Sequence, residues 1–202
     1  RLHCLPSLGV EPGQIKDVVY SAPIFTVPGS IVVIRTSDLH KFSTDDKYVS
    51  FEKLYLDQSL IGGSVKGGTY GEEIAKIMSL KNDNFFQRLA VDSSGLYSML
   101  LKNRVDYVLD YPFAFTHNSQ KLPAEESAKL SFLLLDENRS KANTVAYALC
   151  TNSIHGIEVI EKINQCLRQP QYQQTIADSV SSYLPMSLKE EFRQLNLNLA
   201  DQ

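Results

Sequence analysis

The sequence has few of the features that mark metal-binding, membrane-spanning or secreted chains. Its 202 residues contain three cysteines, with no CxxC spacing and no nearby pair of histidines, so the common zinc motifs are excluded. No apolar run approaches the roughly 20 residues that span a bilayer, and the N-terminus shows no charged-then-apolar signal segment. We therefore expect no metal site, and either a cytosolic protein or one whose leader has been removed.

The chain also has no excess of charge of either sign. It carries 20 Lys and Arg against 23 Asp and Glu, a formal net charge of −3, and its basic residues are scattered along the sequence. Electrostatics therefore gives no reason to expect nucleic acid or an acidic membrane as a partner. A content of 43% hydrophobic and 21% charged residues fits one globular domain, or two small lobes.

The most informative feature that is present is a glycine-rich turn between an apolar strand and an amphipathic helix. Residues 62–74 read GGSVKGGTYGEEI. Glycines 67 and 68 permit positive φ and close approach of a bound group, and the unpaired N–H groups of the following helix favour an acceptor or an anion. An ordinary strand-to-helix connection with Thr69 as N-cap also explains this motif.

The organisation along the chain indicates one complete α/β unit inserted into another. Strands at 86–91 and 105–109 flank a helix at 94–102, which predicts a parallel sheet, and the C-terminal part is helical at 156–168, 170–180 and 188–195. Apolar extended segments at 31–35 and 143–149 enter and leave the middle unit, so we expect them to run side by side as hinge strands. The expected domains are 1–35, 36–142 and 143–202, of which the first and third form one lobe.

The cysteines and aromatic residues give two further expectations. Cys4 and Cys150 each begin an extended segment and could form a disulfide in an oxidising compartment, whereas buried free thiols are the alternative. Cys166 lies on an apolar-periodic helix and is expected to be free and buried. Aromatic residues at 107, 111, 113 and 115 alternate, which predicts that half of them face the core.

Four segments together resemble the type II periplasmic solute-binding proteins, in particular the polar amino acid-binding family of ABC transporters (solute-binding protein family 3). These segments are residues 7–23, which begin SLGV and end YSAP, the strand IVVIR at 31–35, the glycine turn at 62–71, and LKNRVDYV at 101–108. The resemblance implies an α/β fold of two lobes with a hinge, in which lobe 1 is incomplete at its N-terminus. Asp106, in the last segment, is structural in that family.

The resemblance also implies a function. It predicts a non-enzymatic periplasmic protein without cofactor, made with a signal peptide, that binds a small-molecule ligand by lobe closure and delivers it to a membrane transporter or receptor. The alternative is an extracytoplasmic sensory input domain of a signalling protein. Because the family has further elements before the first segment, a second copy could cover the surface left open here, giving a dimer.

Site residues are carried over from the family one position at a time. Gln14 stands where relatives place an arginine that grips the ligand carboxylate, and Lys16 nearby has no planar fork. Tyr111 occupies the position of the acid that binds the amino group, with Asp110 one residue earlier. The resemblance thus predicts a small polar, cyclic or aromatic ligand rather than a standard amino acid, stacked among three tyrosines. The expected ligand-binding residues are Ser7, Gln14, Tyr20, Gly68, Thr69, Tyr70, Asp110 and Tyr111.

Overall fold

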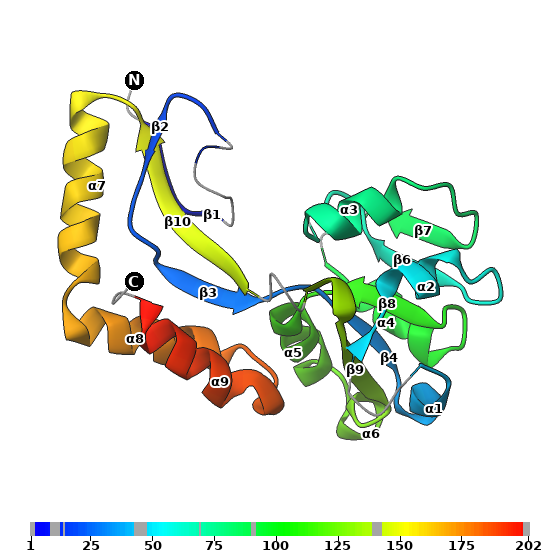
Figure 1. Ribbon diagram of the computed structural model, residues 1–202. Helices are drawn as coiled ribbons and strands as arrows, with labels where there is room; N and C mark the ends of the chain where they lie inside the picture. The colour runs from blue at the N-terminus through cyan, green and yellow to red at the C-terminus, as the bar shows by residue number, and fades with distance from the viewer. Residues whose placement is uncertain are drawn as a thin grey trace. The chain divides into compact units, whose positions relative to one another are not determined.

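The computed structural model describes residues 3–8, 13, 15–42, 48–68, 70–89, 92–138 and 143–199. The chain divides into two compact units, one made of residues 1–28 and 143–202 and the other of residues 29–142. The chain therefore passes from one unit to the other twice. Figure 1 labels most of the helices and strands of both units, which are described in turn.

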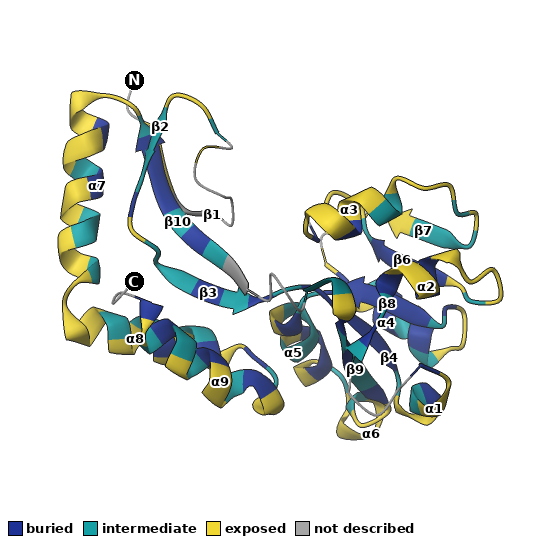
Figure 2. Cartoon of the chain, viewed as in Figure 1, coloured by how far each residue is buried: buried dark blue, intermediate teal, exposed yellow. Residues whose placement is uncertain are grey.

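The first unit is built on the long strand β10 (Asn143–Thr151). Strands β1 (Cys4–Leu8) and β2 (Val18–Tyr20) flank its second half, and β3 (Phe25–Pro28) pairs with its first half, all antiparallel. Three helices follow, α7 (Ile154–Leu167), α8 (Pro170–Ser182) and α9 (Met186–Leu197). Ile160 of α7 packs on Ala148 and Cys150 of β10, while the opposite side of the helix is exposed (Figure 2).

A buried asparagine joins α9 to the sheet of this unit. The Asn196 side chain accepts a hydrogen bond from the backbone N–H of Thr26 at 2.7 Å and donates to its carbonyl at 2.9 Å. Because an unpaired buried amide is costly, both polar ends of Asn196 are matched by the β3 backbone. The contact fixes α9 against the strand that leads out of the unit.

The second unit is a six-stranded mixed sheet with the order β5-β9-β4-β8-β6-β7. Its strands are β4 (Ile31–Arg35), β5 (Tyr48–Val49), β6 (Gly62–Val65), β7 (Phe85–Arg88), β8 (Tyr107–Asp110) and β9 (Leu130–Leu135). Strands β7, β6 and β8 run parallel, as the sequence predicts, whereas β4 is antiparallel to both β8 and β9.

Helices cover both faces of this sheet. On one face α2 (Phe51–Leu56) and α3 (Glu72–Met78) pack on β4 and β8, and on the other face α4 (Ser94–Leu101) and α5 (Pro112–Gln120) do so. The short helices are α1 (Leu39–Phe42) and α6 (Ala124–Ser127), with 3-10 turns at Thr36–Asp38 and Asp136–Asn138. The central strands are the most deeply buried part of the unit (Figure 2).

The strand expected as the first hinge connector lies instead within the second unit. Ile31–Arg35 forms β4 between β8 and β9, and its first four side chains are fully buried. A continuous apolar run is typical of a strand covered on both faces, and this explains the four consecutive apolar residues. The segment that pairs with β10 beside the crossing points is β3, where Pro28 lies opposite Asn143.

The alternation of aromatic residues also ends earlier than the sequence suggested. Tyr107 belongs to β8, but residues 112–120 are helical, with Pro112 at the first position of α5. Proline suits that position because its missing N–H would have no partner there and its φ matches a helix. Phe113 and Phe115 are therefore placed by a helix, so the prediction from period two was wrong for them.

Candidate functional site

The predicted site residues of the second unit gather at one edge of its sheet. Since β6, β7 and β8 are parallel, their carboxyl ends meet at the same edge, and the antiparallel β4 begins there. The glycine turn follows β6, Asp92 and Ser93 follow β7, and Tyr111 follows β8. Ligands of open α/β sheets bind outside the carboxyl ends of the strands, which makes this edge the candidate binding surface.

The glycine turn is shaped by Tyr70. Gly67 and Gly71 have positive φ, of 84° and 103°, and Gly71 rather than Thr69 is the N-cap of α3. A Cβ on Gly68 would lie 2.6 Å from the Tyr70 ring, so this ring makes the close approach that the sequence suggested for a ligand. Thr69 lies outside the described residues.

Hydrogen bonds at both ends of Tyr70 hold it against neighbouring segments of the chain. Its hydroxyl accepts a hydrogen bond from the Val65 N–H at 3.2 Å and donates to the Val65 carbonyl at 3.3 Å, while its own carbonyl accepts from Ser30. Burial, together with the nearby charge of Asp110, raises the pKa of Tyr70 to about 12. Tyr70 is thus a neutral, 5% exposed ring that shapes the edge.

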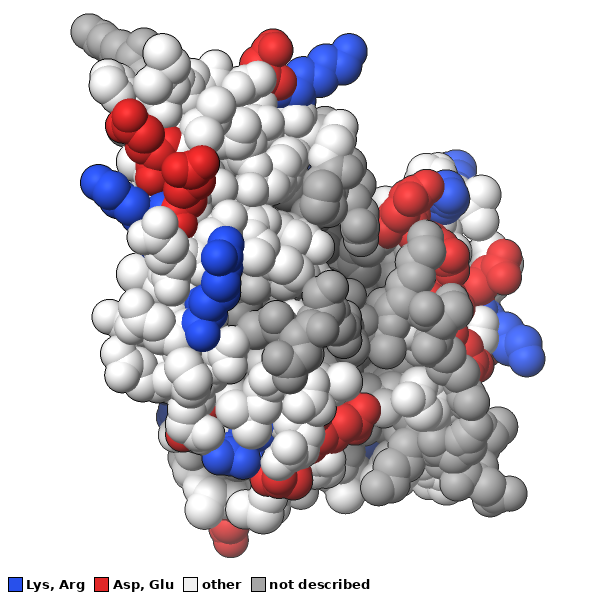
Figure 3. Space-filling view, turned by 60° about the vertical axis from the view of Figure 1, so that its left-hand side comes forward, with Lys and Arg blue, Asp and Glu red and all other residues white. Residues whose placement is uncertain are grey.

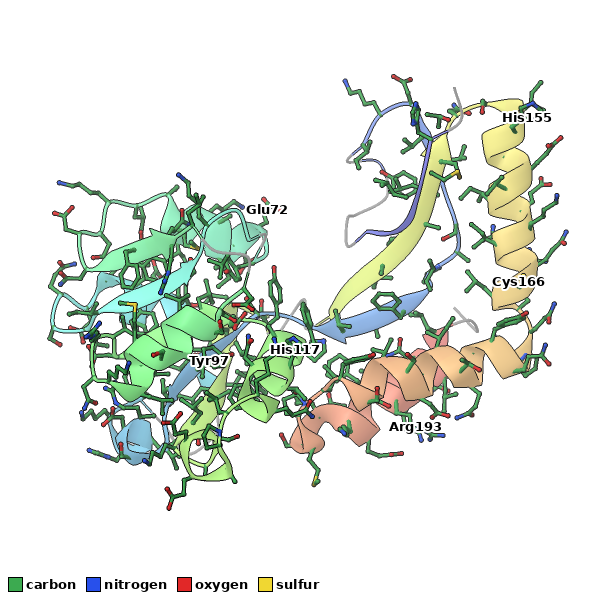
Figure 4. All side chains as sticks on the ribbon, turned by 180° about the vertical axis from the view of Figure 1, so that it is seen from behind. Glu72, Tyr97, His117, His155, Cys166 and Arg193 are labelled. Carbon is green, nitrogen blue, oxygen red and sulfur yellow. A yellow bond between two sulfur atoms is a disulfide. The ribbon has the colours of Figure 1, made fainter. Side chains whose placement is uncertain are left out.

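Asp110 lies at the centre of a buried polar network. One carboxyl oxygen accepts hydrogen bonds from the hydroxyls of Ser93 and Tyr97, the latter at 2.8 Å, and the other accepts from the Tyr111 N–H at 2.9 Å. Asn118 donates to the Ser93 hydroxyl at 2.8 Å, and its side-chain oxygen is buried without a partner among the described residues. Figure 4 labels Tyr97 on α4. Both oxygens of Asp110 are therefore bonded within the protein.

Burial decides the ionisation of this network. It raises the pKa of Asp110 despite the hydrogen bonds from Ser93, Tyr111 and Tyr97, which act in the opposite direction. Burial likewise raises the pKa of Tyr97 well above its usual range, and the charge of Asp110 adds to that effect. Tyr97 thus remains a hydrogen-bond donor to the carboxyl group.

Three aromatic rings form a row at the same edge, which we call the aromatic row: Tyr70, Tyr111 and Phe113. Tyr70 stacks on Tyr111 with ring centroids 5.3 Å apart and planes at 19°, and Tyr111 stacks on Phe113 at 5.1 Å and 13°. Exposure rises along the row from Tyr70 through the partly buried Tyr111 to Phe113, which is 41% exposed. Tyr70 and Tyr111 are thus committed to protein rings.

Phe113 is a residue of the edge that was not among the predicted ligand-binding residues. Its position depends on the turn into α5, and the available signal was Pro112, which is typical of a first helical position. A helix starting there places residue 113 back beside Tyr111 instead of continuing the strand. The structure thus brings together Gly68, Tyr70, Asp110 and Tyr111, with Phe113 added.

The remaining predicted residues belong to the first unit. The Tyr20 hydroxyl accepts a hydrogen bond from the Ile15 N–H at 3.1 Å, and its ring meets Tyr147 edge-on at 6.2 Å. Ser7 lies in β1, but its side chain is outside the described part of the chain, as is all of Gln14. Tyr20 thus has a structural partner in its own unit.

The structure confirms one expectation about the cysteines and corrects another. Cys4 and Cys150 are paired across β1 and β10 and form a disulfide, with Cα atoms 4.1 Å apart. Cys166 is free, as expected, but it is exposed, which corrects the expectation of a buried thiol. It lines an open hollow of about 300 Å³ between α7 and α8. Figure 4 labels Cys166 on α7. The other lining residues are Val159, Lys162, Ile163, Leu167, Tyr172 and Ile176.

Asp106 has the structural role that the resemblance implies. Its carboxylate pairs with Arg35 at 3.1 Å and accepts the Ile61 N–H at 2.9 Å. Arg35 also bonds Asp38 and donates to the carbonyls of Leu100 and Val105. This cluster joins β4 to the segment before β8, away from the carboxyl edge.

The surface is of mixed charge. Among the described residues on the face shown in Figure 3, acidic and basic side chains are interspersed. Within the described part of the chain, no helix combines the length and apolarity needed to cross a bilayer.

Comparison with known proteins gives the fold. No protein-family model matches the sequence, and no curated protein matches it significantly. Among solved structures, the substrate-binding protein of an amino acid ABC transporter is 18% identical with a TM-score of 0.54, over 84% of this chain and 66% of that one. The amino acid ABC transporter substrate-binding protein AbpA from Streptococcus pneumoniae, bound to L-arginine, is 14% identical with a TM-score of 0.52. The match covers 98% of this chain and 67% of that one.

A third structure extends this comparison. The ancestral amino acid-binding protein AncCDT-1, a precursor of cyclohexadienyl dehydratase, is 12% identical with a TM-score of 0.55, over 87% of this chain and 66% of that one. At such identities the likeness establishes architecture: the chain has the fold of the type II periplasmic binding proteins. This chain spans 66% of the length of the first of these proteins, which is slightly less than two thirds.

Proposed function

We propose that this chain is the ligand-binding component of an ABC-type uptake system, and that it captures a small polar solute by closure of its two units. The observation that supports this most strongly is the shared fold with substrate-binding proteins of amino acid transporters, which extends over 84% to 98% of the chain in two of them. The disulfide between Cys4 and Cys150 favours an oxidising location such as the periplasm.

The connections between the units support a hinge. The chain leaves the first unit at Pro28 and re-enters it at Asn143, and these residues are paired in the sheet of that unit. In the second unit, Asn138 near the exit donates a hydrogen bond to the carbonyl of Ser30 near the entry, at 2.8 Å. Two adjacent connections allow rotation about one place, which is the usual arrangement for hinge closure around a ligand.

The carboxyl edge favours a solute that is not a standard amino acid. The acid expected to meet an amino group has both oxygens bonded by Ser93, Tyr97 and Tyr111, and Tyr111 itself stands in the aromatic row. Asp110 is also only 4% exposed, so a ligand ammonium group has little access to its carboxyl group. Together with Gln14 in place of the family arginine, this argues for a neutral or weakly charged amino-acid-like solute.

Calorimetric titration of the chain, with its disulfide intact, tests the proposal. We expect no tight binding of the twenty amino acids, and tight binding of one member of a panel of neutral cyclic and aromatic metabolites that Thr69→Ala weakens. Failure of every solute to bind would overturn the transport role. Submicromolar binding of an ordinary L-amino acid would instead refute the proposed ligand class.

Gln14→Arg tests the role carried over for that position. A bidentate guanidinium–carboxylate contact contributes hydrogen bonds of roughly 1.5–3 kcal/mol each, so we expect the variant to bind a free amino acid about ten- to a thousandfold more tightly than the parent. Gln171→Arg on α8 adds the same charge at an exposed site and serves as the matched control. An equal gain in affinity for the amino acid in both variants would mean that the added charge, and not the position of residue 14, causes the gain.

A further inference from the structure

Phe113 is the accessible end of the aromatic row. The Tyr70 ring is almost fully buried and its hydroxyl is bonded to Val65, whereas Phe113 is 41% exposed. The three rings are close to parallel, since their successive planes differ by 19° and 13°. A fourth flat group could continue this arrangement on Phe113 in the same offset geometry.

The row is fixed before any ligand binds. Asp110 accepts the N–H of Tyr111 at 2.9 Å, and Pro112 restricts the backbone just before Phe113. The Tyr70 ring, which stacks on Tyr111, is held in turn by hydrogen bonds of its hydroxyl to both polar groups of the Val65 backbone. A preorganised ring loses little conformational entropy when a ligand stacks on it, which makes Phe113 a suitable platform.

The row also lies where a ligand is expected in this fold. It begins beside the glycine turn after β6 and ends in the first turn of α5 after β8, so it follows the carboxyl ends of two parallel strands. Tyr111 and Phe113 carry no charge, and the nearby Asp110 is occupied by protein donors. This part of the edge therefore offers a flat apolar surface rather than a charged partner.

We propose that Phe113 determines specificity by stacking on a planar ring of the ligand. The inference rests on the proposed solute-binding function and narrows its ligand class to solutes that contain a flat, unsaturated ring. A stacked aromatic pair contributes enough to change affinity about two- to tenfold relative to a saturated ring of equal size.

Matched probes separate a flat ring from a merely apolar one. Benzamide and cyclohexanecarboxamide carry the same polar group on rings of six carbons, one planar and one puckered. Ligand-observed NMR titration of the chain should give benzamide an affinity about two- to tenfold higher than cyclohexanecarboxamide. Phe113→Leu, which keeps an apolar side chain, should abolish the difference, and Tyr183→Leu, at an exposed aromatic of the first unit, should preserve it. Equal affinities in the parent chain, or a preference that survives Phe113→Leu, would overturn the proposal.

A second readout does not depend on loss of binding. The sequence contains no tryptophan, so Phe113→Trp introduces a single indole at the end of the row. Benzamide should quench its fluorescence saturably, whereas Tyr183→Trp should show only collisional quenching. Tight binding of a solute without a flat ring, unaffected by Phe113→Leu, would refute the stacking while leaving solute capture intact. A preference for benzamide that depends on Phe113, with no solute binding tightly in calorimetry, would support the stacking but refute the proposed solute capture.

Discussion

At the scale of single residues, Asp110 shows how neighbours decide what a carboxyl group can do. Its position beside Tyr111 made it a candidate partner for a ligand amino group, and that position is visible in the sequence. The donors that occupy it come from Ser93 and Tyr97, 17 and 13 residues away along the chain. Only the tertiary fold brings α4 against the end of β8, so this pairing could not be read from local sequence.

The raised pKa of Asp110 predicts a specific pH dependence of stability. Because burial raises its folded pKa above the unfolded value of about 3.9, its contribution to stability is fully present below that value and is lost as pH rises through the folded pKa. Asp110→Asn should lower the free energy of unfolding by about 1–3 kcal/mol through imperfect hydrogen bonding. It should also abolish the decrease in stability that Asp110 causes as pH rises. Urea unfolding between pH 3.5 and 7 should therefore show the gap between parent and variant narrowing as pH rises.

A control for that experiment lies at the same edge of the sheet. Asp92 is exposed, and hydrogen bonds from the Ser94 hydroxyl and N–H lower its pKa. Its contribution is present above the unfolded pKa and lost as pH falls, so Asp92→Asn should give the opposite trend or none. If the gap for Asp110→Asn did not change with pH, burial would not control the ionisation of Asp110.

At the scale of elements, the start of α7 depends on a glycine. A Cβ on Gly156 would lie 2.0 Å from the carbonyl oxygen of Thr151 at the end of β10. The same turn is capped by Ser153, whose hydroxyl accepts the Gly156 N–H at 3.1 Å. The glycine therefore permits β10 and α7 to meet closely, and α7 then packs on the sheet through Ile160.

Gly156→Ala should therefore destabilise the first unit. The clash is with backbone, which cannot rotate away, so we expect a loss of about 2–4 kcal/mol in the free energy of unfolding, measured by urea denaturation. Gly67→Ala is the control, because a Cβ there meets open space and the cost arises from its φ of 84°, at about 1–2 kcal/mol. A smaller loss for Gly156→Ala than for Gly67→Ala would show that the turn relaxes easily.

Elements with a clear period could be predicted from the sequence, and those set by long-range pairing could not. The parallel pairing of β6, β7 and β8 follows from alternating strand and helix patterns, and α7 follows from apolar residues at helical spacing. The role of β4 was misjudged because a run of four buried residues looks the same in a hinge as in a sheet centre. Its neighbours β8 and β9 are about 75 and 100 residues away, beyond the reach of local pattern.

Part of the candidate site was predictable for the same reason. Gly68, Tyr70, Asp110 and Tyr111 lie at or just after the ends of two parallel strands, and topology alone brings such residues to one edge. The contacts among their side chains depend on packing, so the stacking of Tyr70 on Tyr111 was not foreseen. Phe113 was missed because a turn into a helix was interpreted as the continuation of a strand.

At the scale of the whole molecule, the disulfide should stabilise the two units unequally. Cys4 and Cys150 both belong to the first unit and are separated by 146 positions, most of which form the second unit. If the second unit stays folded, its ends are held together by Asn138 and Ser30. The loop closed by the disulfide then consists of two short pieces totalling about 40 residues, for which loop entropy gives about 4 kcal/mol.

Reduction should therefore weaken the first unit and leave the second unchanged. Hydrogen exchange measured by mass spectrometry should show faster exchange in peptides from β1, β2 and β10 after reduction, while peptides from β4 and β8 retain their protection. Cys4→Ser with Cys150→Ser should reproduce this pattern without reductant, and Cys166→Ser, which removes the free thiol, should leave it unchanged. Equal acceleration in both units would mean that they unfold as one cooperative body, because stabilisation by the disulfide would then reach residues that it does not cross-link.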